Sequence, residues 1–393
     1  MKKSTQKSSG KHVLVLDVGT TGIKAIVFDN DLNEIAIASN PLPKREFKSH
    51  WVEQNPPDLL RISQNTLRQA VKKSQLQPNE FGGFGLTNQR ETTILWDTVT
   101  RKAVYPAIVW EDKRTAKHCA SLKKYQQTIL HKTGLVIDPY FSATKISWIL
   151  ENIPAAKKLL AQKRLGFGTV DSWILWNFTQ EQNHVTDYTN ACRTLLFNIR
   201  TLKWDKSLLD IFEVPKTILP KIKPSKSNFG TLKKSILGFS LPVKAVIGDQ
   251  QSSAYATGVK RGLTKITYGT GTFINQSIGR TFQLHQPFFT TLLPSGKKPL
   301  YAVEGKIESS ASKVSKALNR PIQLNKIITE IATDVNFFVQ NLPLKPKQII
   351  VDGGITQYPD LIKIQSRISK IPVVRQITHN GTALGVAKLI LDN

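Results

Sequence analysis

A turn rich in glycine and threonine joins two apolar runs near the start of the chain. The runs flank residues 19–22, Gly-Thr-Thr-Gly, a pattern that predicts a β-hairpin. Glycine lets the backbone approach a charged group, the hydroxyls of Thr20 and Thr21 can donate to phosphate oxygens, and Asp17 can hold a Mg²⁺ ion. A phosphate-binding hairpin and an ordinary hairpin with a glycine turn both fit this stretch.

The same pattern returns in the second half of the chain. Residues 267–273, Thr-Tyr-Gly-Thr-Gly-Thr-Phe, again predict a strand, a Gly-Thr-Gly turn and a strand. Two phosphate loops that face each other across a cleft would clamp a nucleotide. The repeat therefore favours the phosphate-binding interpretation and predicts a duplicated ATP-binding fold.

A run of polar residues follows the predicted buried strand 81–86. It contains Arg90 and Glu91 and leads into the apolar residues 94–96, at a strand end where α/β folds place ligands. A surface turn with a charge pair is one explanation. A binding site for the hydroxyl groups of a polyol is the favoured explanation, because the planar guanidinium of Arg90 donates and the carboxylate of Glu91 accepts. Trp110, after a later strand, is either a core residue or the apolar wall of a small pocket.

A single carboxylate, Asp249, stands between Gly248 and the amide Gln250, where the apolar strand 243–247 leads into a helix. An acidic residue in this place is often only a helix N-cap. A general base that accepts a proton from a hydroxyl fits the position equally well.

The elements that would position these residues are strands and helices in succession. Asn55 and Pro56 offer the N-cap and the first residue of an amphipathic helix, and the polar loop 186–191 is predicted to be structural. The stretch 215–238, rich in Pro, Lys and Ser, is predicted to be a surface crossover between two domains. Strand 243–247 would then open the second domain.

Length and composition allow two domains. The chain has 393 residues, of which 40% are hydrophobic and 21% charged, enough for two cores in a globular protein. No apolar run approaches the roughly 18 to 20 residues of a membrane span. Residues 1–10 are predicted to be a disordered basic lead and not a secretion signal, so a cytoplasmic location is expected. Cys119 and Cys192 lack the spacing of a metal site.

The charge balance is strongly basic, with 55 Lys and Arg against 28 Asp and Glu and a net charge of +27. A basic surface attracts phosphates of any kind, including nucleic acid. Because we find no aromatic-basic RNA motif or recognition helix, solvated lysine faces are the favoured explanation, and no specific nucleic-acid partner is predicted.

Six motifs, in order along the chain, resemble those of the FGGY carbohydrate kinases, and among these most closely the glycerol kinases. The motifs are residues 17–21, 87–93, 134–142, 248–251, 268–271 and 351–354. The resemblance implies an α/β fold of two actin-like, RNase H-type ATPase domains, residues 11–242 and 243–393, around a central cleft.

The resemblance also implies an activity and a role for each matching residue. The activity would be ATP-dependent phosphorylation of glycerol to sn-glycerol 3-phosphate, with Asp249 as general base and with Mg²⁺. The residues that would contact glycerol are Arg90, Glu91, Trp110, Tyr140, Asp249, Gln250 and Phe273. The residues that would contact the nucleotide are Thr20, Thr21, Gly22, Lys24, Thr270, Gly271, Gly353 and Gly354, and Asp17 would bind the metal.

The departures from the family pattern fall on the nucleotide side. Lys24 stands where the family usually has Arg, Ala311 and Ser315 stand where it has Gly and Gln, and Tyr358 replaces an Asn near the adenine. The long insert that the family carries after about residue 320 is missing, so the second domain is shortened. Two alternatives therefore stay open, a catalytically weak relative that acts as a glycerol sensor or scaffold, and a kinase for another polyol or sugar. The prediction allows a homo-oligomer.

Overall fold

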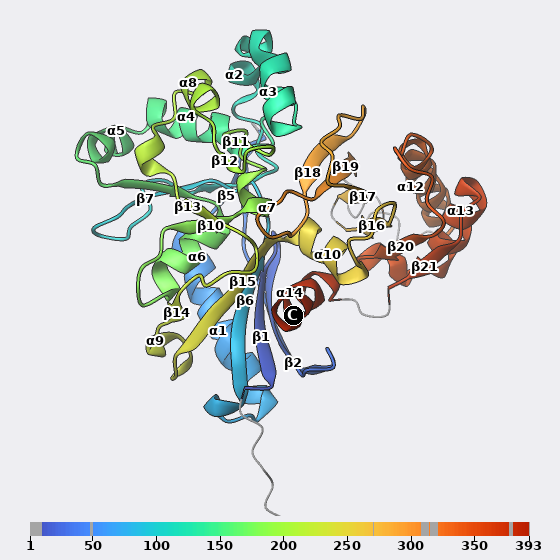
Figure 1. Ribbon diagram of the computed structural model, residues 1–393, viewed down its shortest axis with the longest axis horizontal. Helices are drawn as coiled ribbons and strands as arrows, with labels where there is room; N and C mark the ends of the chain where they lie inside the picture. The colour runs from blue at the N-terminus through green and yellow to red at the C-terminus, as the bar shows by residue number, and fades with distance from the viewer. Residues whose placement is uncertain are drawn as a thin grey trace, which may run out of the picture. The chain divides into compact units, whose positions relative to one another are not determined.

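The computed structural model describes residues 10–47, 50–269, 271–307, 314, 321–376 and 380–392. The chain forms two compact units, the first made of Met1–Asp249 and Val386–Asn393 and the second of Gln250–Gly385 (Figure 1). Residues 1–9 of the predicted basic lead lie outside the described residues.

A six-stranded sheet organises the first unit. In spatial order its strands are β14 (Thr231–Leu232), β15 (Leu241–Gly248), β6 (Phe81–Asn88), β1 (His12–Val18), β2 (Gly22–Phe28) and β3 (Glu34–Pro41). Strands β1, β2 and β3 pair antiparallel in succession, whereas β1, β6 and β15 run parallel. The predicted hairpin around residues 19–22 is confirmed.

The strand predicted to open the second domain belongs to the sheet of the first unit. Val246 of β15 lies opposite Leu86 of β6, and Gly248 lies opposite Asn88. The stretch 215–238, predicted to cross between domains, contains β13 (Lys221–Lys223), β14 and α9 (Lys234–Leu237) of the same unit. A buried apolar strand has the same residue pattern in either sheet, so the pattern could not reveal its pairing partner.

Helix α1 (Pro56–Ser74) packs against β2 and β3 and buries Leu59 and Leu67 completely. Asn55 occupies the predicted N-cap position, but its side chain donates to Oδ2 of Asp58 at 3.1 Å instead of capping the backbone. Pro56 stands in the first turn, where its missing N–H costs nothing.

The last helix, α14 (Gly381–Leu391), belongs to the second unit up to Gly385 and to the first from Val386 onward. The close packing of α14 requires a glycine at one position in each unit. A Cβ at Gly85 of β6 would lie 2.2 Å from Cγ1 of Val386, and a Cβ at Gly385 would lie 1.9 Å from the carbonyl oxygen of Ser252.

The rest of the first unit consists of short strands and helices. The strands are β4 (Arg45–Glu46), β5 (Val52–Gln54), β7 (Ile94–Asp97), β8 (Ala107–Ile108), β9 (Leu165–Gly168), β10 (Val185–Asp187), β11 (Phe197–Asn198) and β12 (Lys203–Trp204). The helices are α2 (Ala116–Ser121), α3 (Gln126–Thr133), α4 (Ser142–Asn152), α5 (Pro154–Ala161), α6 (Val170–Phe178), α7 (Tyr188–Ala191) and α8 (Lys206–Ile211).

A second six-stranded sheet organises the second unit. In spatial order its strands are β18 (Phe289–Leu292), β19 (Tyr301–Ile307), β17 (Thr272–Gly279), β16 (Thr264–Tyr268), β20 (Ile349–Asp352) and β21 (Val373–Arg375). Strands β16, β17 and β19 pair antiparallel in succession, and β16, β20 and β21 run parallel. These pairings repeat those of β1, β2, β3, β6 and β15, so the predicted duplication is confirmed in the topology.

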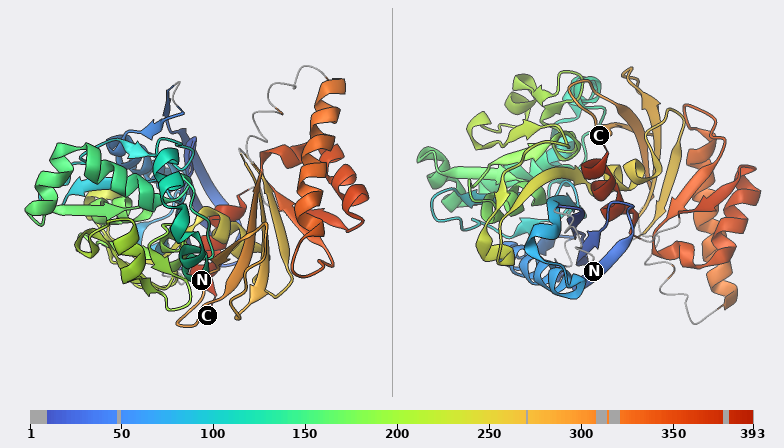
Figure 2. Two further views of the ribbon diagram at one scale, coloured as in Figure 1. Left: turned by 90° about the horizontal axis from the view of Figure 1, so that it is seen from above. Right: turned by 60° about the horizontal axis from the view of Figure 1, so that its bottom comes forward.

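Helices α12 (Pro321–Gln340) and α13 (Pro359–Ser369) lie side by side against the sheet of the second unit (Figure 2). Ile331 and Val335 of α12 are buried in the core that these helices share with β16 and β20. In the described part of the chain, no helix is both long enough and apolar enough to cross a membrane.

Candidate active site

The turn of the first hairpin is fixed by two side chains from other parts of the first unit. The Gly19 N–H donates to the Gly22 carbonyl oxygen at 3.0 Å. Nε2 of Gln54 donates to the Thr20 carbonyl oxygen at 2.7 Å, and Nε1 of Trp110 donates to the Thr20 hydroxyl at 2.9 Å. Because that hydroxyl accepts from Trp110, its own proton is directed elsewhere, as a phosphate-binding role requires.

Asp17 of β1 lies opposite Lys24 of β2. Part of the residue is accessible, yet burial of its carboxyl group raises the pKa of Asp17 to about 7, with Lys24 opposing the rise and Asp249 adding to it. A bound cation would favour the carboxylate form of such a group. Asp17 and Asp249 therefore fit Mg²⁺, which binds proteins through one or two carboxylates plus substrate phosphates and water. No group of three or more His, Cys, Asp or Glu residues among those described forms a metal site.

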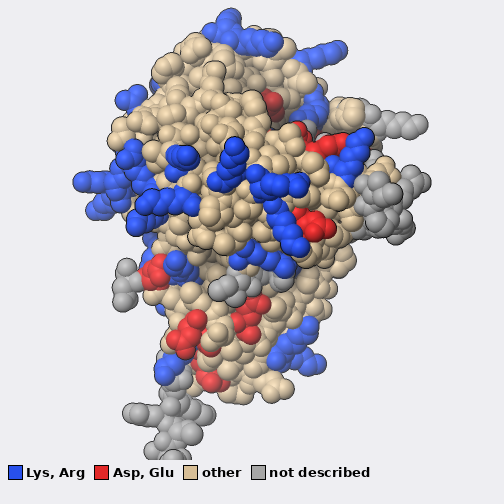
Figure 3. Space-filling model, turned by 90° about the vertical axis from the view of Figure 1, so that its right-hand side faces the viewer, with Lys and Arg blue, Asp and Glu red and all other residues tan. Residues whose placement is uncertain are grey.

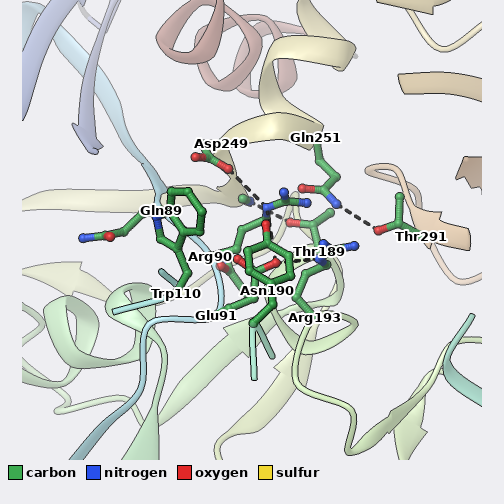
Figure 4. A network of polar contacts seen from close by, with 12 residues as sticks. Gln89, Arg90, Glu91, Trp110, Thr189, Asn190, Arg193, Asp249, Gln251 and Thr291 are labelled. Atoms are coloured by element: carbon green, nitrogen blue, oxygen red, sulfur yellow. Dashed lines mark hydrogen bonds and ion pairs between the residues drawn. The ribbon is translucent and has the colours of Figure 1, made fainter. Parts of the chain in front are cut away.

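Arg90 and Glu91 are buried, which rules out the surface-turn explanation. Their side chains are 1% and 2% exposed. Nε of Arg90 lies 3.2 Å from Oδ1 of Asp249 and 3.9 Å from Oε1 of Glu91 (Figure 4). Glu91 has φ +60°, a left-handed conformation that non-glycine residues adopt at a cost and that is common at functional sites.

The segment 186–191 holds the ends of two strands beside this cluster. Nδ2 of Asn88, the last residue of β6, donates to Oδ1 of Asn190 at 3.0 Å. The N–H of Gly248, the last residue of β15, donates to the hydroxyl of Thr189 at 2.7 Å. One short helix, α7, therefore fixes the backbone that leads into Arg90 and the backbone that leads into Asp249.

Arg193 belongs to the same buried cluster, although its sequence position gave no prediction of it. Its side chain is 0% exposed, and its Nε donates to Oε1 of Glu91 at 2.6 Å. The available signal was a lone charge in the run 191–197, Ala-Cys-Arg-Thr-Leu-Leu-Phe. A buried charge needs a partner, but the run does not say which one.

Two aromatic side chains stand beside the cluster. Trp110 and Tyr140 are in edge-to-face contact, with ring centroids 5.7 Å apart and planes at 87°. Tyr140 is buried and Trp110 is half-buried. Half-burial and the bond from its indole N–H to Thr20 suit a pocket wall better than a core residue.

The second hairpin is also present in the structure. Tyr268 and Thr272 pair next to the turn, and the Gly269 N–H donates to the Gly271 carbonyl oxygen at 3.1 Å. Phe273 follows on β17 and is buried. The predicted site residue Thr270 lies outside the described residues, as do Ala311 and Ser315.

Helix α10 (Asp249–Thr257), which begins with Asp249 and Gln250, is anchored within the second unit. Ser253 donates to Oδ2 of Asp352 at 2.8 Å, and Lys265 donates to Ser253 at 2.8 Å and pairs with Asp352. Burial lowers the pKa of Lys265, and Asp352 opposes this.

The predicted glycines directly follow Asp352. Gly353 has φ +95°, and a Cβ there would lie 2.3 Å from the carbonyl oxygen of Tyr268, whereas Gly354 faces open space. Tyr358 packs, partly buried, against the core of the second unit.

Two sheets that share the pairing of five strands, each with a glycine turn after the first strand of its antiparallel part, define the actin-like α/β class. Solved structures agree with this assignment. A Plasmodium falciparum glycerol kinase with ADP superimposes with a TM-score of 0.89 at 27% identity, covering 97% of this chain and 89% of that one. A Brucella ovis xylulose kinase at 19% identity, with a TM-score of 0.84 over 97% of this chain and 90% of that one, supports the fold alone.

Sequence comparisons are more specific. Residues 12–256 match the N-terminal domain of the FGGY family of carbohydrate kinases. A glycerol kinase of Borreliella afzelii is 43% identical over 443 aligned positions, covering 96% of this chain and 88% of the relative. A glycerol kinase of Mycoplasma pneumoniae is 43% identical over 308 positions, which cover 76% of this chain and 61% of the relative. The chain belongs to the FGGY family of carbohydrate kinases.

Proposed function

We propose that this protein transfers the γ-phosphoryl group of ATP to a terminal hydroxyl of glycerol, giving sn-glycerol 3-phosphate. The observation that carries the proposal is the buried cluster of Arg90, Glu91 and Asp249, with Nε of Arg90 3.2 Å from Oδ1 of Asp249. The glycerol kinase relatives that are 43% identical support the choice of substrate.

The polyol would be held by groups of opposite hydrogen-bonding character. The guanidinium of Arg90 can donate two parallel bonds and the carboxylate of Glu91 can accept, so together they match neighbouring hydroxyl groups. Trp110 and Tyr140 would cover the carbon chain and exclude water. A hydroxyl missing from a competing substrate would leave one of these buried groups short of a hydrogen bond, which is a strong basis for specificity. Gln250 and Phe273 are proposed as further contacts on the family resemblance.

Asp249 would act as the general base. Its carboxylate would accept the proton of the attacking hydroxyl while that oxygen bonds to the γ-phosphorus and the bond to the ADP oxygen breaks. Nε of Arg90, 3.2 Å from Oδ1 of Asp249, would orient this carboxylate before the transfer. Phosphoryl transfer needs little covalent help, so positioning and charge neutralisation supply most of the acceleration.

The first hairpin would bind the phosphates of ATP through Thr20, Thr21, Gly22 and Lys24. Thr270, Gly271, Gly353 and Gly354 are proposed to contribute from the second unit. Asp17 would hold Mg²⁺, with Asp249 nearby. When bound, the cation supplies neutralisation of phosphate charge. A cytoplasmic location and a homo-oligomeric state stay predictions.

The test is ATP-dependent formation of glycerol 3-phosphate by the purified protein at moderate salt. Asp249→Ala should lower kcat by at least about 100-fold because the base is lost. Arg90→Ala should raise KM for glycerol and lower kcat, because the same guanidinium serves both substrate and base. Asp360→Asn, which changes an exposed carboxylate on α13, is the matched control and should behave like the wild type.

Turnover by the wild type that persists unchanged in Asp249→Ala would contradict the assigned base. A wild type that binds glycerol but shows no turnover would favour the sensor or scaffold alternative. Turnover of another polyol or sugar with a higher kcat/KM than glycerol would replace the substrate and leave the reaction class in place.

A further inference from the structure

We propose that Arg193 is a positioning residue that acts through Glu91 and sets the selectivity of the site for the full set of polyol hydroxyls. The inference rests on the proposed function and deepens it. It starts from a guanidinium that is 0% exposed and donates to Oε1 of Glu91 at 2.6 Å. Figure 4 shows Arg193 and Arg90 together with Glu91 and Asp249 in this cluster.

The cluster contains two arginines and two carboxylates, which form two ion pairs. Arg193 lies 2.6 Å from Glu91, and Arg90 lies 3.2 Å from Asp249. Arg90 is also within 3.9 Å of the same Oε1 of Glu91. Arg90 therefore has two carboxylates within reach, and Arg193 occupies the one that is not the proposed base.

Arg193 is held in this orientation by rings and by the backbone. Its guanidinium carbon lies 5.5 Å from the ring centroid of Tyr140 and 5.1 Å from that of Phe141, distances at which a cation is attracted to an aromatic face. The backbone N–H of Arg193 donates to the Asn190 carbonyl oxygen at 3.1 Å, which fixes the main chain from which the side chain extends. A planar guanidinium can donate through Nε and stack on rings at once, which a lysine cannot.

Glu91 is fixed from its other end as well. Its carbonyl oxygen accepts from the hydroxyl of Ser142 at 3.0 Å and from the hydroxyl of Thr93 at 3.1 Å. With the backbone set by these bonds and Oε1 set by Arg193, the second carboxylate oxygen has a defined direction. A carboxylate held in this way can select substrates that carry a hydroxyl at the position where this oxygen accepts a hydrogen bond.

Without Arg193, Glu91 would be left with Arg90 as its cation, and Arg90 would be drawn away from Asp249. Glu91, which would contact the polyol, and Arg90, which lies beside the proposed base, would then both change position. We therefore expect a protein without Arg193 to lose substrate discrimination as well as rate. A reoriented Glu91 carboxylate no longer rejects an analogue that lacks a hydroxyl.

The experiment compares kcat/KM for glycerol with kcat/KM for propane-1,2-diol and propane-1,3-diol in the full-length protein. Arg193→Met should lower kcat/KM for glycerol on the order of 100-fold, as expected for loss of one partner of a buried pair. The ratio of glycerol to the analogue that lacks the Glu91-bound hydroxyl should fall by about ten-fold or more. Arg193→Lys should lie between this variant and the wild type.

Arg114→Met is the matched control, because the side chain of Arg114 is also fully buried, pairs with Asp112 and Glu53, and stacks on Trp51. It should lower thermal stability and leave the glycerol-to-diol ratio as in the wild type. Adding Arg193→Met to Glu91→Gln should not change the ratio further, since Arg193 acts through Glu91. A wild-type ratio in Arg193→Met, or additive effects in the double variant, would overturn the proposal. If Arg193→Met does not fold, a wild-type ratio in Arg193→Lys overturns it equally.

Glycerol binding measured by calorimetry without ATP separates this proposal from the proposed function. A wild type without turnover would count against the kinase activity alone. The binding affinities for glycerol and the two diols in the wild type and the Arg193 variants would then show whether Arg193 governs hydroxyl selection. Equal relative affinities in all of these proteins would refute the positioning role.

Discussion

Trp110 and Thr20 connect the two ends of the candidate site in the first unit. The indole that would cover the polyol donates its N–H to the hydroxyl of the turn that would bind phosphate, at 2.9 Å. The orientation of that hydroxyl therefore depends on the position of the Trp110 ring. A polyol packed against the ring would restrict the ring and, through this bond, the Thr20 hydroxyl.

We predict that Trp110→Phe, which keeps an aromatic wall but removes the N–H, lowers kcat by about 2- to 10-fold, the range expected for one hydrogen bond. The affinity for glycerol should change much less. Steady-state kinetics on Trp110→Phe, Thr20→Val and the double variant test this. The double variant should be no slower than Thr20→Val alone, and effects that multiply would show that the bond plays no part in turnover.

At this scale the sequence suggested several residues of the candidate site but not the side chains that they pair with. Arg90 and Glu91 were predicted to bind a ligand because α/β folds place ligands at strand ends. Asp249 was grouped with them by the family resemblance, since an N-cap explained its position equally well. Arg193 was missed because its partner Glu91 lies far away in sequence, and only the fold brings the two together. Local spacing carries no information about such a pair.

At the scale of elements, α6 begins with a buried acid. Asp171 is fully buried and accepts hydrogen bonds from the hydroxyls of Thr169 and Thr186. Burial raises the pKa of Asp171 from 3.8 to about 7, and Asp187 adds to the rise. Between pH 4 and 7 the folded protein therefore holds a proton at this site that the unfolded chain releases, so the free energy of unfolding falls as the pH rises.

Asp171→Asn should remove this dependence, because an amide keeps both neighbours hydrogen-bonded and does not titrate. We predict that the free energy of unfolding of the variant, minus that of the wild type, is larger at pH 8 than at pH 5 by at most about 3 kcal/mol. Urea unfolding at the two pH values measures the difference. Asp360→Asn, at an exposed site, should show no such gain, and a gain of equal size in both variants would contradict the assignment to Asp171.

The elements themselves were predicted well where the pattern was local. Both hairpins and the start of α1 follow from turn residues, flanking apolar runs and a proline at the first turn. Residues 243–247 were predicted as a strand that opens the second domain, whereas this strand pairs with β6 in the first unit. Its pairing with β6 depends on contacts across the chain, which apolar periodicity does not encode.

At the scale of the whole molecule the net charge of +27 is the dominant property. Lys and Arg side chains are spread over the face shown in Figure 3, with fewer Asp and Glu among them. Scattered charges of this kind attract polyanions without reading a sequence. We therefore expect affinity for nucleic acid that has no part in the enzymatic activity.

Binding to a fluorescent random-sequence DNA duplex, followed by anisotropy, should be measurable at 50 mM salt. It should weaken by about 1,000-fold or more at 200 mM if six or more phosphates are contacted. Two duplexes of unrelated sequence should bind alike. Binding that survives 200 mM salt, or that prefers one sequence, would indicate a nucleic-acid site that the charge alone does not explain.

The last helix determines when the first unit can be completed during synthesis. Val386 of α14 fills the space above Gly85, yet β6 leaves the ribosome long before Val386 is translated. At 5 to 20 residues per second the interval is roughly 15 to 60 seconds. During that time the whole second unit is made while the position over Gly85 stays uncovered. The first unit to be translated is therefore the last to be finished.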